Sequence, residues 1–456
     1  MTNRPILICL ALLVSRMFAF SEDEPAILRR INAGVQAIRL IDTHEHLAPE
    51  PERVKKEMSL FSVLHYVTSD MWADGMERAP SDRMFEDPSV PLEKKWELFA
   101  PYWSNVRYTG YGRSLLRAVR DLYGINDISE STYKEISRRI KESNQLGKYE
   151  AVLKKKAGID LAICDVGDAG SSLDPGLFRA VIRLDHFLMY PEATMIVEPA
   201  LGVTINSLAD WEAALDKAFQ QARDKKFVAI KAGLAYYRSL DFRMVERPEA
   251  EALFDQLKER KGKPAIPDWS KNKPLQDYMF GRIAEACARY DLPLQIHTGF
   301  FYDTGRNVTQ ADPSLLIPFI LRHRTTRFVL MHGGYPYGGP LLAMAKNLPN
   351  VTLDMCWTYI ISPAFAGRFL DEAIETVPAD KILAFGGDYQ VAEGSYAHAV
   401  LCREVVSKIL AEKVAAGYWT EKEALQFARA VLRENAIRVF KLQPEMQASE
   451  DARPEE

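Results

Sequence analysis

Short apolar segments alternate with amphipathic segments through most of this chain. The apolar segments are rich in Val, Ile, Leu and Phe, as expected of strands that are covered on both faces. Alternating strands and helices indicate a parallel α/β architecture, and eight strands favour a (β/α)8 TIM barrel. The eight predicted strands are residues 38–43, 159–166, 194–199, 227–231, 292–297, 328–332, 351–355 and 382–385.

Between these strands, apolar residues recur at helical spacing. Residues 211–223 follow the capping candidate Ser207, and residues 420–440 open with Thr-Glu-Lys-Glu, a capping-box pattern. Residues 275–290 and 313–323 show the same periodicity. We therefore expect the barrel to occupy residues 25–442.

The connection after the first strand is much longer than an ordinary βα loop. It spans residues 47–157, contains helical stretches at 92–99, 112–122 and 130–142, and is rich in Trp and Tyr. It leaves the barrel at the end where active sites lie. The pattern predicts a helical subdomain that covers the barrel mouth and shapes access to it.

Polar residues with ligand chemistry close five of the apolar segments. His44 and His46 form an H-x-H pair, and residues i and i+2 of a strand point to the same side. His297 and His332 each end an apolar run, and Asp388 follows two glycines that let the backbone approach closely. Nitrogen and carboxylate ligands at successive strand ends predict a metal site at the barrel mouth.

Three further residues are candidates for substrate binding. Lys231 ends a strand, and we expect it to anchor a substrate carboxylate, to be a carbamylated bridge between metals, or to lie in solvent. Arg238 follows on the next loop and is either a clamp for an anionic group or a surface residue. Tyr335 and Tyr337 either contribute hydroxyls to the pocket or pack in a turn. The remaining histidines, His65, His186, His323 and His398, are interpreted as structural or surface residues.

Composition narrows the function classes. The 456 residues carry a net charge of −4 from well-mixed acids and bases, and no basic stripe indicates nucleic-acid binding. Cys164, Cys287, Cys356 and Cys402 are scattered, which favours buried free thiols over disulfides. No G-x-S-x-G elbow, Walker loop or G-x-G-x-x-G fingerprint after a strand is present. The expected partner is a small anionic molecule. A homo-oligomer is compatible with the chain, but no segment predicts an interface.

Both ends of the chain differ from the rest. Arg4 precedes an apolar run at residues 6–14 that is too short to span a bilayer, so residues 1–22 predict a signal peptide and export to the periplasm or medium. Arg16 leaves an uncleaved anchor as the alternative; after cleavage no membrane contact is expected. Residues 443–456 are polar and predict a disordered tail.

The motifs resemble the amidohydrolase superfamily, and within it the amidohydrolase-related branch. Residues 229–236 (AIKAGLAY), 293–299 (PLQIHTG) and 329–336 (VLMHGGYP) look most like the amidohydrolase half of FluG-type fusions, and so does the segment 105–113 (NVRYTGYGR). The long insertion together with the H-x-H pair is also similar to uronate isomerases, which share the barrel.

The resemblance implies a divalent metal, usually zinc, with one or two ions per chain, held by His44, His46, His297 and Asp388. It implies that His332 is an acid/base or electrophilic group, or a ligand to a second metal, and that Asp388 transfers the proton of an activated water. The implied activity is hydrolysis of an amide C–N bond, with a γ-glutamyl or other carboxylate-bearing amide as substrate. The alternatives are decarboxylase or isomerase chemistry on a small carboxylated substrate and, third, a non-catalytic binding barrel.

Overall fold

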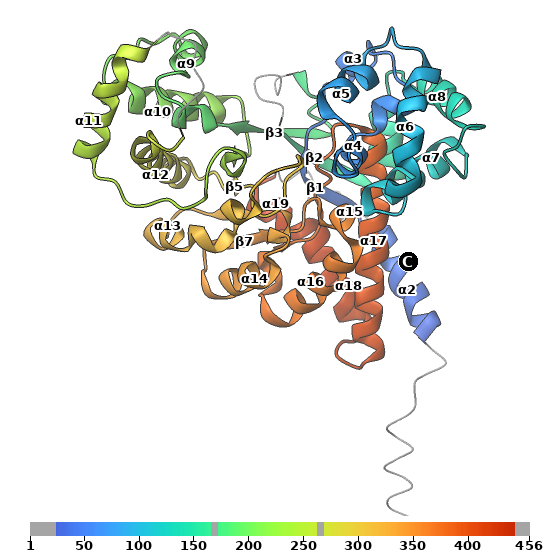
Figure 1. Cartoon of the computed structure of the whole chain (residues 1–456). Helices are drawn as coiled ribbons and strands as arrows, with labels where there is room; N and C mark the ends of the chain where they lie inside the picture. Colours follow the sequence, from blue (N-terminus) through green and yellow to red (C-terminus); the bar gives the residue numbers. More distant parts are fainter. Residues whose placement is uncertain (1–23, 166–171, 262–268, 443–456) are drawn as a thin grey trace, which may run out of the picture.

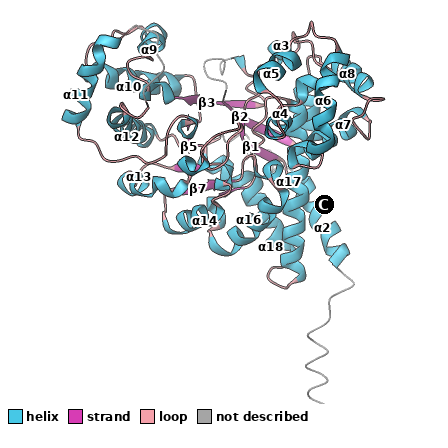
Figure 2. Cartoon of the chain, viewed as in Figure 1, coloured by secondary structure: helices cyan, strands magenta, loops and turns pink. Residues whose placement is uncertain are grey.

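The computed structural model describes residues 24–165, 172–261 and 269–442. Eight parallel strands lie side by side in chain order at its centre, as Figure 2 shows in magenta, with helices around them. The fold is therefore the predicted (β/α)8 barrel. The strands are β1 (Leu40–Glu45), β2 (Ile159–Asp165), β3 (Phe178–Arg183), β4 (Ala229–Ala232), β5 (Leu294–Ile296), β6 (Phe328–Leu330), β7 (Val351–Asp354) and β8 (Ile382–Leu383).

The segment that follows β8 closes the barrel against β1. The backbone N–H of Thr43 donates to the carbonyl of Phe385 (3.1 Å), and that of His46 donates to the carbonyl of Tyr389 (2.9 Å). Inward side chains of the strands form a buried apolar cluster inside the barrel. The helix α19 (Asn435–Val439) contributes Ile437 and Val439 to the same cluster. The barrel interior is thus a packed core that supports the rim above it.

The outer layer consists of helices that follow the strands. The capping boxes at Ser207 and Thr420 are both present, at the starts of α10 and α18. The segment predicted as one helix at 420–440 is divided by a π-helical stretch at Ala430–Glu434. Figure 1 shows α2, from the start of the described chain, lying along α17. The outer helices are α2 (Glu24–Ala37), α9 (Thr194–Leu201), α10 (Leu208–Asp224), α11 (Arg247–Leu257), α12 (Lys273–Tyr290), α13 (Ile317–Arg322), α14 (Gly338–Asn347), α15 (Thr358–Ile361), α16 (Pro363–Thr376), α17 (Ala392–Ala415) and α18 (Glu421–Arg429).

The prediction for the third strand is wrong. Residues 194–199 lie in the helix α9, and the third strand is β3. Pro199 has no N–H to give to a strand ladder, and Gly202 ends the helix in the left-handed conformation (φ 61°) that is common at helix C-termini. Arg179 and Arg183 interrupt the apolar pattern of β3 in the sequence, so its strand character was hidden.

The insertion between β1 and β2 is helical, as expected. Figure 1 shows its helices in blue and cyan, gathered on one side of the molecule. Their apolar side chains form a second buried cluster, which continues onto Met331, Trp357 and Tyr389 in the loops after β6, β7 and β8. The insertion therefore rests on the rim that carries the predicted site. Its helices are α3 (Glu50–Arg53), α4 (Tyr66–Ala73), α5 (Arg78–Glu86), α6 (Leu92–Val106), α7 (Gly110–Tyr123), α8 (Tyr133–Glu142) and the π-helix Glu150–Lys156.

The predicted signal peptide and the predicted disordered tail lie outside the described residues. Within the described residues, no helix is both long and apolar enough to span a bilayer.

Candidate metal centre

Each of the eight strands delivers a polar side chain to the same end of the barrel. Because the strands are parallel, their carboxyl ends meet at one rim. The residues at or just beyond these ends are His44 and His46 (β1), Asp165 (β2), Arg183 (β3), Lys231 (β4), His297 (β5), His332 (β6), Cys356 (β7) and Asp388 (β8). The five strand ends for which we predicted functional residues thus belong to a ring in which all eight strands contribute a polar side chain.

His44 is fully buried, and neither nitrogen of its imidazole has a hydrogen-bond partner. Its Nε2 lies 3.8 Å from Oδ1 of Asp388. Burial lowers the pKa of His44 well below its usual value, so the ring is neutral. A buried polar group without a partner is costly, and a metal ion bound at a nitrogen lone pair would remove that cost. This arrangement fits a metal ligand.

His46 lies next to the same carboxylate. Its Nε2 is 3.3 Å from Oδ1 of Asp388, and its Nδ1 is 3.2 Å from the backbone carbonyl of Asp165. A carbonyl accepts only, so Nδ1 carries a hydrogen, as is usual for a histidine that binds a metal through its other nitrogen. One ligand atom from each of His44, His46 and Asp388 lies within 4.8 Å of the others. These three residues can hold one divalent ion.

The loop that carries Asp388 is held by β1. Asp388 has a left-handed backbone (φ 59°), and its N–H donates to the carbonyl of His44 (2.7 Å). The N–H of Gly387 donates to Oδ1 of Asp42 (2.9 Å), and the N–H of Tyr389 donates to Oε2 of Glu45 (2.7 Å). Three successive backbone groups are therefore fixed by the strand that also carries both histidines.

The charges of these carboxyl groups differ because their surroundings differ. Burial raises the pKa of Asp42 to about 7 and that of Glu45 well above its usual value. Burial also acts to raise the pKa of Asp388, but the hydrogen bond from His46 and the neighbouring imidazoles outweigh it and hold this pKa well below its usual value. Asp388 is the ionised carboxylate of the group and the natural partner of a cation.

His297, which we expected to be a fourth ligand, is not among the residues whose ligand atoms lie together at β1 and β8. Its Nε2 lies 2.7 Å from the carbonyl of Phe300, and its Nδ1 lies 2.9 Å from Nε2 of His332. Both nitrogens of His297 are therefore engaged. His297 is therefore not part of the group formed by His44, His46 and Asp388, and its assignment as a ligand stays a prediction.

Lys231 is 3% exposed, which excludes the interpretation that it lies in solvent. Its Nζ is 2.7 Å from Sδ of Met331, and its charge acts to lower the pKa of both His44 and His297. Burial lowers the pKa of Lys231 itself. The amine faces the cluster from β4. Two interpretations of Lys231 therefore stay open: an anchor for a substrate carboxylate and a carbamylated bridge between metals.

Arg238 is not brought to the site. Its guanidinium forms a buried ion pair with Asp277 (2.7 Å), bonds to Gln276 (3.0 Å) and lies over the ring of Phe242. These contacts satisfy it inside the protein, so its role is structural. Arg183, and not Arg238, lies at the barrel rim, where we expected an arginine that binds an anionic group.

Arg183 is the strand partner of Lys231 in the pairing of β3 with β4. It is bound to Asp165, and its Nε is buried without a hydrogen-bond partner. The carboxylate of Asp165 that it binds lies 4.0 Å from Nδ1 of His46, so the guanidinium lies near the candidate ligands of β1. Sequence reasoning missed Arg183 because it missed β3.

The insertion brings two further residues close to the site: Tyr66, and His65, which we interpreted from the sequence as structural or surface. His65 immediately precedes α4 with a positive φ (42°), and its ring contacts those of Tyr66, Tyr302 and Tyr389. The hydroxyl of Tyr66 donates to the backbone carbonyl of Asp388. His65 therefore lies beside the site, not in a remote structural position. In the sequence, the adjacent pair His65-Tyr66 near the start of the insertion was the only signal that could have indicated these residues.

Tyr335 is half-buried three residues after His332. Its ring packs against those of Phe300 and Phe365. It therefore lies beside Phe300, whose carbonyl accepts from His297. This contact places Tyr335 at the edge of the histidine pair.

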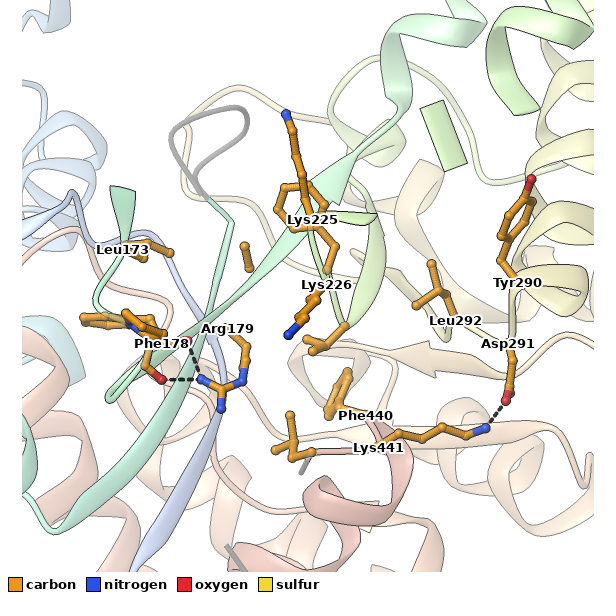
Figure 3. Close-up of a pocket in the computed structure, with 15 residues that line it drawn as sticks. Leu173, Phe178, Arg179, Lys225, Lys226, Tyr290, Asp291, Leu292, Phe440 and Lys441 are labelled. Atoms are coloured by element: carbon orange, nitrogen blue, oxygen red, sulfur yellow. Dashed lines mark hydrogen bonds and ion pairs between the residues drawn. The ribbon is translucent and has the colours of Figure 1, made fainter. Parts of the chain in front are cut away.

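Two cavities lie at opposite ends of the barrel. One, of about 550 Å³, is lined by His46, by Tyr149 and by residues of the insertion such as Arg53 and Met58. It gives a small molecule room next to a metal ligand. The other, of about 720 Å³ and shown in Figure 3, is lined by the starting ends of β3, β4 and β5, with Phe178 and Leu292 among its residues, and so lies away from the metal centre.

The chain is similar to several known proteins. Protein fluG of Emericella nidulans is 26% identical over 226 residues, which are 48% of this chain and 26% of that protein. The glucuronate isomerase of Caulobacter crescentus superimposes with a TM-score of 0.76 at 18% identity, covering 95% of this chain and 96% of its own. The uronate isomerase of Thermotoga maritima gives a TM-score of 0.75 at 16% identity, covering 91% and 97%. These two structures share the fold.

The model of the amidohydrolase family matches residues 200–442. The matched region contains β4 to β8 and therefore Lys231, His297, His332 and Asp388. It covers more than half of the 456 residues. The chain therefore belongs to the amidohydrolase family.

Proposed function

We propose that this protein is a metal-dependent hydrolase that cleaves an amide C–N bond in a small carboxylate-bearing molecule, with γ-glutamyl amides as the first substrates to test. The observation that carries the proposal is His44, a fully buried imidazole with two unpartnered nitrogens beside an ionised Asp388. His44, His46 and Asp388 would hold the metal, and nitrogen and carboxylate ligands favour zinc. When bound, such an ion acidifies a water molecule and polarises the substrate carbonyl.

Asp388 is the residue that moves the proton. It is ionised at neutral pH, so its carboxylate accepts the proton that the attacking water loses. The same carboxylate then gives this proton to the nitrogen of the leaving amine. The three backbone hydrogen bonds to residues 387–389 keep the carboxylate in place during both transfers.

His332 does not supply a proton in this scheme. Burial lowers its pKa to about 4, so the ring is neutral at physiological pH. This low pKa argues against a positively charged His332 as the electrophile. A neutral imidazole offers one N–H donor and one lone pair.

The substrate carboxylate is recognised by Arg183 and Lys231. Both lie at neighbouring strand ends, and the buried Nε of Arg183 is free to donate. Charge-assisted hydrogen bonds from a guanidinium orient a carboxylate strongly. Asp165, already bound to Arg183, keeps the guanidinium at the rim.

A second candidate is isomerisation of a sugar acid. The observation that favours it is the similarity to the glucuronate isomerase of Caulobacter crescentus, which extends over 95% of this chain and so includes the helical insertion. A uronate carries the same carboxylate group as the proposed amide substrates. The two candidates differ in the bond that changes: hydrolysis adds water and releases an amine, whereas isomerisation leaves the mass unchanged.

The experiment is to incubate the zinc-loaded protein with a panel of γ-glutamyl amides and, separately, with hexuronates. Release of ammonia or amine, absent in Asp388→Asn, supports the hydrolase. A ketose of unchanged mass supports the isomerase and contradicts the hydrolase. Turnover of amides by Asp388→Asn at the wild-type rate would contradict the role of Asp388.

A further inference from the structure

The cavity beside His46 extends the candidate site into the helical insertion. It has a volume of about 550 Å³, and Arg53, Lys55 and Lys56 line it from the end of α3 and the turn that follows. This space accommodates a further part of a substrate whose scissile carbonyl lies at the metal ligands. The residues that line it therefore select the group that the substrate carries beyond the amide nitrogen.

Arg53 brings a buried donor to this cavity. The residue is 3% exposed, and its two terminal nitrogens donate to Asn144 (2.6 Å) and to Glu393 (2.9 Å). Its Nε–H, in contrast, is buried and has no hydrogen-bond partner. A buried donor without an acceptor is costly, so an anionic oxygen bound in the cavity would stabilise this guanidinium.

The network behind Arg53 holds an excess of positive charge. Glu393 accepts from Arg53 and from Lys148 (2.9 Å), so a single carboxylate faces two buried cations. Tyr123 also donates to Glu393 but carries no charge, because burial raises the pKa of its hydroxyl. One positive charge of the network is therefore left over to attract an anion.

Lys55 and Lys56 add two exposed positive charges to the wall of the cavity. The carboxylates in this wall are Glu57 and Glu86, and Glu57 is already paired with Lys141 (2.6 Å). With the buried arginine, the wall has three cations against two carboxylates. Its charge thus attracts an anion and does not repel it.

We propose that the substrate is a γ-glutamyl amino acid, in which the leaving amine carries a carboxylate that Arg53, Lys55 and Lys56 bind. The proposal rests on the proposed function, in which Arg183 and Lys231 hold the carboxylate of the acyl part. These two residues end β3 and β4, whereas the cavity lies between the end of β1, the loop after β8 and the insertion. Cations at two places on the rim match a substrate with a carboxylate on each side of its scissile amide.

Hydrolysis of this substrate yields two amino acids. The oxygen of water forms a bond to the carbonyl carbon, the C–N bond breaks, and the leaving nitrogen takes up a proton, so that glutamate and a free amino acid are released. A hexuronate, the substrate of the second candidate function, has one carboxylate. It would leave the cations at one of the two places without an anionic partner.

The test uses γ-glutamylglycine and γ-glutamylglycinamide as a matched pair of substrates. They differ only in that a neutral amide replaces the carboxylate of the leaving group. Glutamate release from each substrate gives kcat and KM separately. We expect the wild type to cleave γ-glutamylglycine about tenfold more efficiently in kcat/KM, mainly through a lower KM, because charge-assisted hydrogen bonds hold the carboxylate.

Two variants test the residues of the cavity. Lys55→Ala/Lys56→Ala removes two exposed charges and should reduce the preference for the carboxylate by about threefold, as expected for solvated ion pairs. Arg53→Lys keeps the cation of the buried network but removes the Nε–H donor, and it should also reduce the preference. Lys225→Ala/Lys226→Ala is the matched control, since these adjacent exposed lysines line the cavity at the opposite end of the barrel (Figure 3).

A preference that falls in either cavity variant and persists in the control supports the proposal. Equal cleavage of the two substrates by the wild type, a preference unchanged in both cavity variants, or an equal fall in the control overturns it and leaves the hydrolase intact. If Arg53→Lys does not fold, the variant with both cavity lysines replaced decides alone. No glutamate from either substrate would refute the proposed function and this proposal together.

Discussion

The Oδ1 oxygen of Asp388 lies 3.3 Å from Nε2 of His46, so the loop after the last strand meets the end of the first strand through their functional side chains. This contact depends on the path of residues 386–389. Every backbone N–H from Gly387 to Tyr389 is bound to β1. Metal binding should therefore be sensitive to small changes in this loop.

Gly387→Ala should weaken metal binding. A Cβ at this position would lie 1.9 Å from Oε1 of Glu45 and 3.0 Å from Oδ2 of Asp42, so the loop or the buried carboxyl groups must move. Overpacking of this kind costs about 1–3 kcal/mol. Zinc affinity measured with a competing chelator should fall, and thermal stability with it. Gly339→Ala is the control, since a Cβ there meets nothing within 4 Å; an equal loss in both variants would argue against the loop as the cause.

Arg183→Ala should raise KM for a carboxylate-bearing substrate; because it also removes the cation paired with the buried Asp165, KM is measured on the folded fraction. A hydrogen bond to a charged group contributes about 1.5–3 kcal/mol, which corresponds to a change in KM of about tenfold to a hundredfold. Steady-state kinetics with a substrate and with its uncharged ester measure the effect. The ester should bind equally to both proteins. A similar loss for substrate and ester would show that Arg183 does not hold the carboxylate.

Arg238→Ala should lower the stability of the fold and leave KM unchanged, the reverse of what we expect for Arg183→Ala. It removes one of the two cations paired with the buried Asp277, whose Oδ2 keeps Lys273 (2.6 Å), so the loss should stay below the about 3–5 kcal/mol of a fully broken buried ion pair. Denaturant unfolding measures this loss. The folded fraction should keep the wild-type KM, because the structure places Arg238 away from the metal centre. A raised KM would instead support the prediction from the sequence that Arg238 binds an anionic substrate group.

Glu393→Gln should loosen the helical insertion. Glu393 is buried in α17 and accepts from Arg53 (2.9 Å), Tyr123 (2.6 Å) and Lys148 (2.9 Å), all of which belong to the insertion. Removing its charge leaves two buried cations uncompensated, at a cost of about 3–5 kcal/mol. Hydrogen exchange should rise in α3 and α7. Glu404→Gln, which breaks an exposed pair of the same helix with Arg117, should cost less than about 1 kcal/mol.

Glu393 also makes the stability of the protein sensitive to acid. The charges of Arg53 and Lys148 outweigh burial and lower the pKa of Glu393 to about 2 from 4.5 in the unfolded chain. A depressed carboxyl pKa stabilises the fold above the unfolded value, and this contribution is lost as pH falls from about 4.5 toward 2. The difference in stability between wild type and Glu393→Gln should therefore shrink over this window. A constant difference across the window would contradict the assignment.

The sequence predicted those parts of the fold in which local pattern and tertiary structure agree. The barrel, the helical insertion and the free buried cysteines were all readable, because apolar runs and capping boxes are local signals. β3 was missed because Arg179 and Arg183 interrupt its apolar pattern, so that its sequence departs from that of a buried strand.

The site was predicted less completely, since ligand geometry depends on side-chain direction. His297 stands at the expected strand end, but its two nitrogens are engaged by the carbonyl of Phe300 and by His332. Cys356 was interpreted only as a buried thiol, because nothing in the sequence places it beside His332 and Asp388. Contacts between distant strand ends arise only when the barrel closes.

The most direct test of the account is metal analysis of the purified protein after incubation with zinc, comparing wild type with His44→Ala. We predict that the wild type retains zinc after removal of the free metal and that His44→Ala loses the ion held by β1 and β8. Equal zinc content in the two proteins, or no retained zinc, manganese or cobalt in the wild type, would contradict the assignment of His44, His46 and Asp388 as a metal centre.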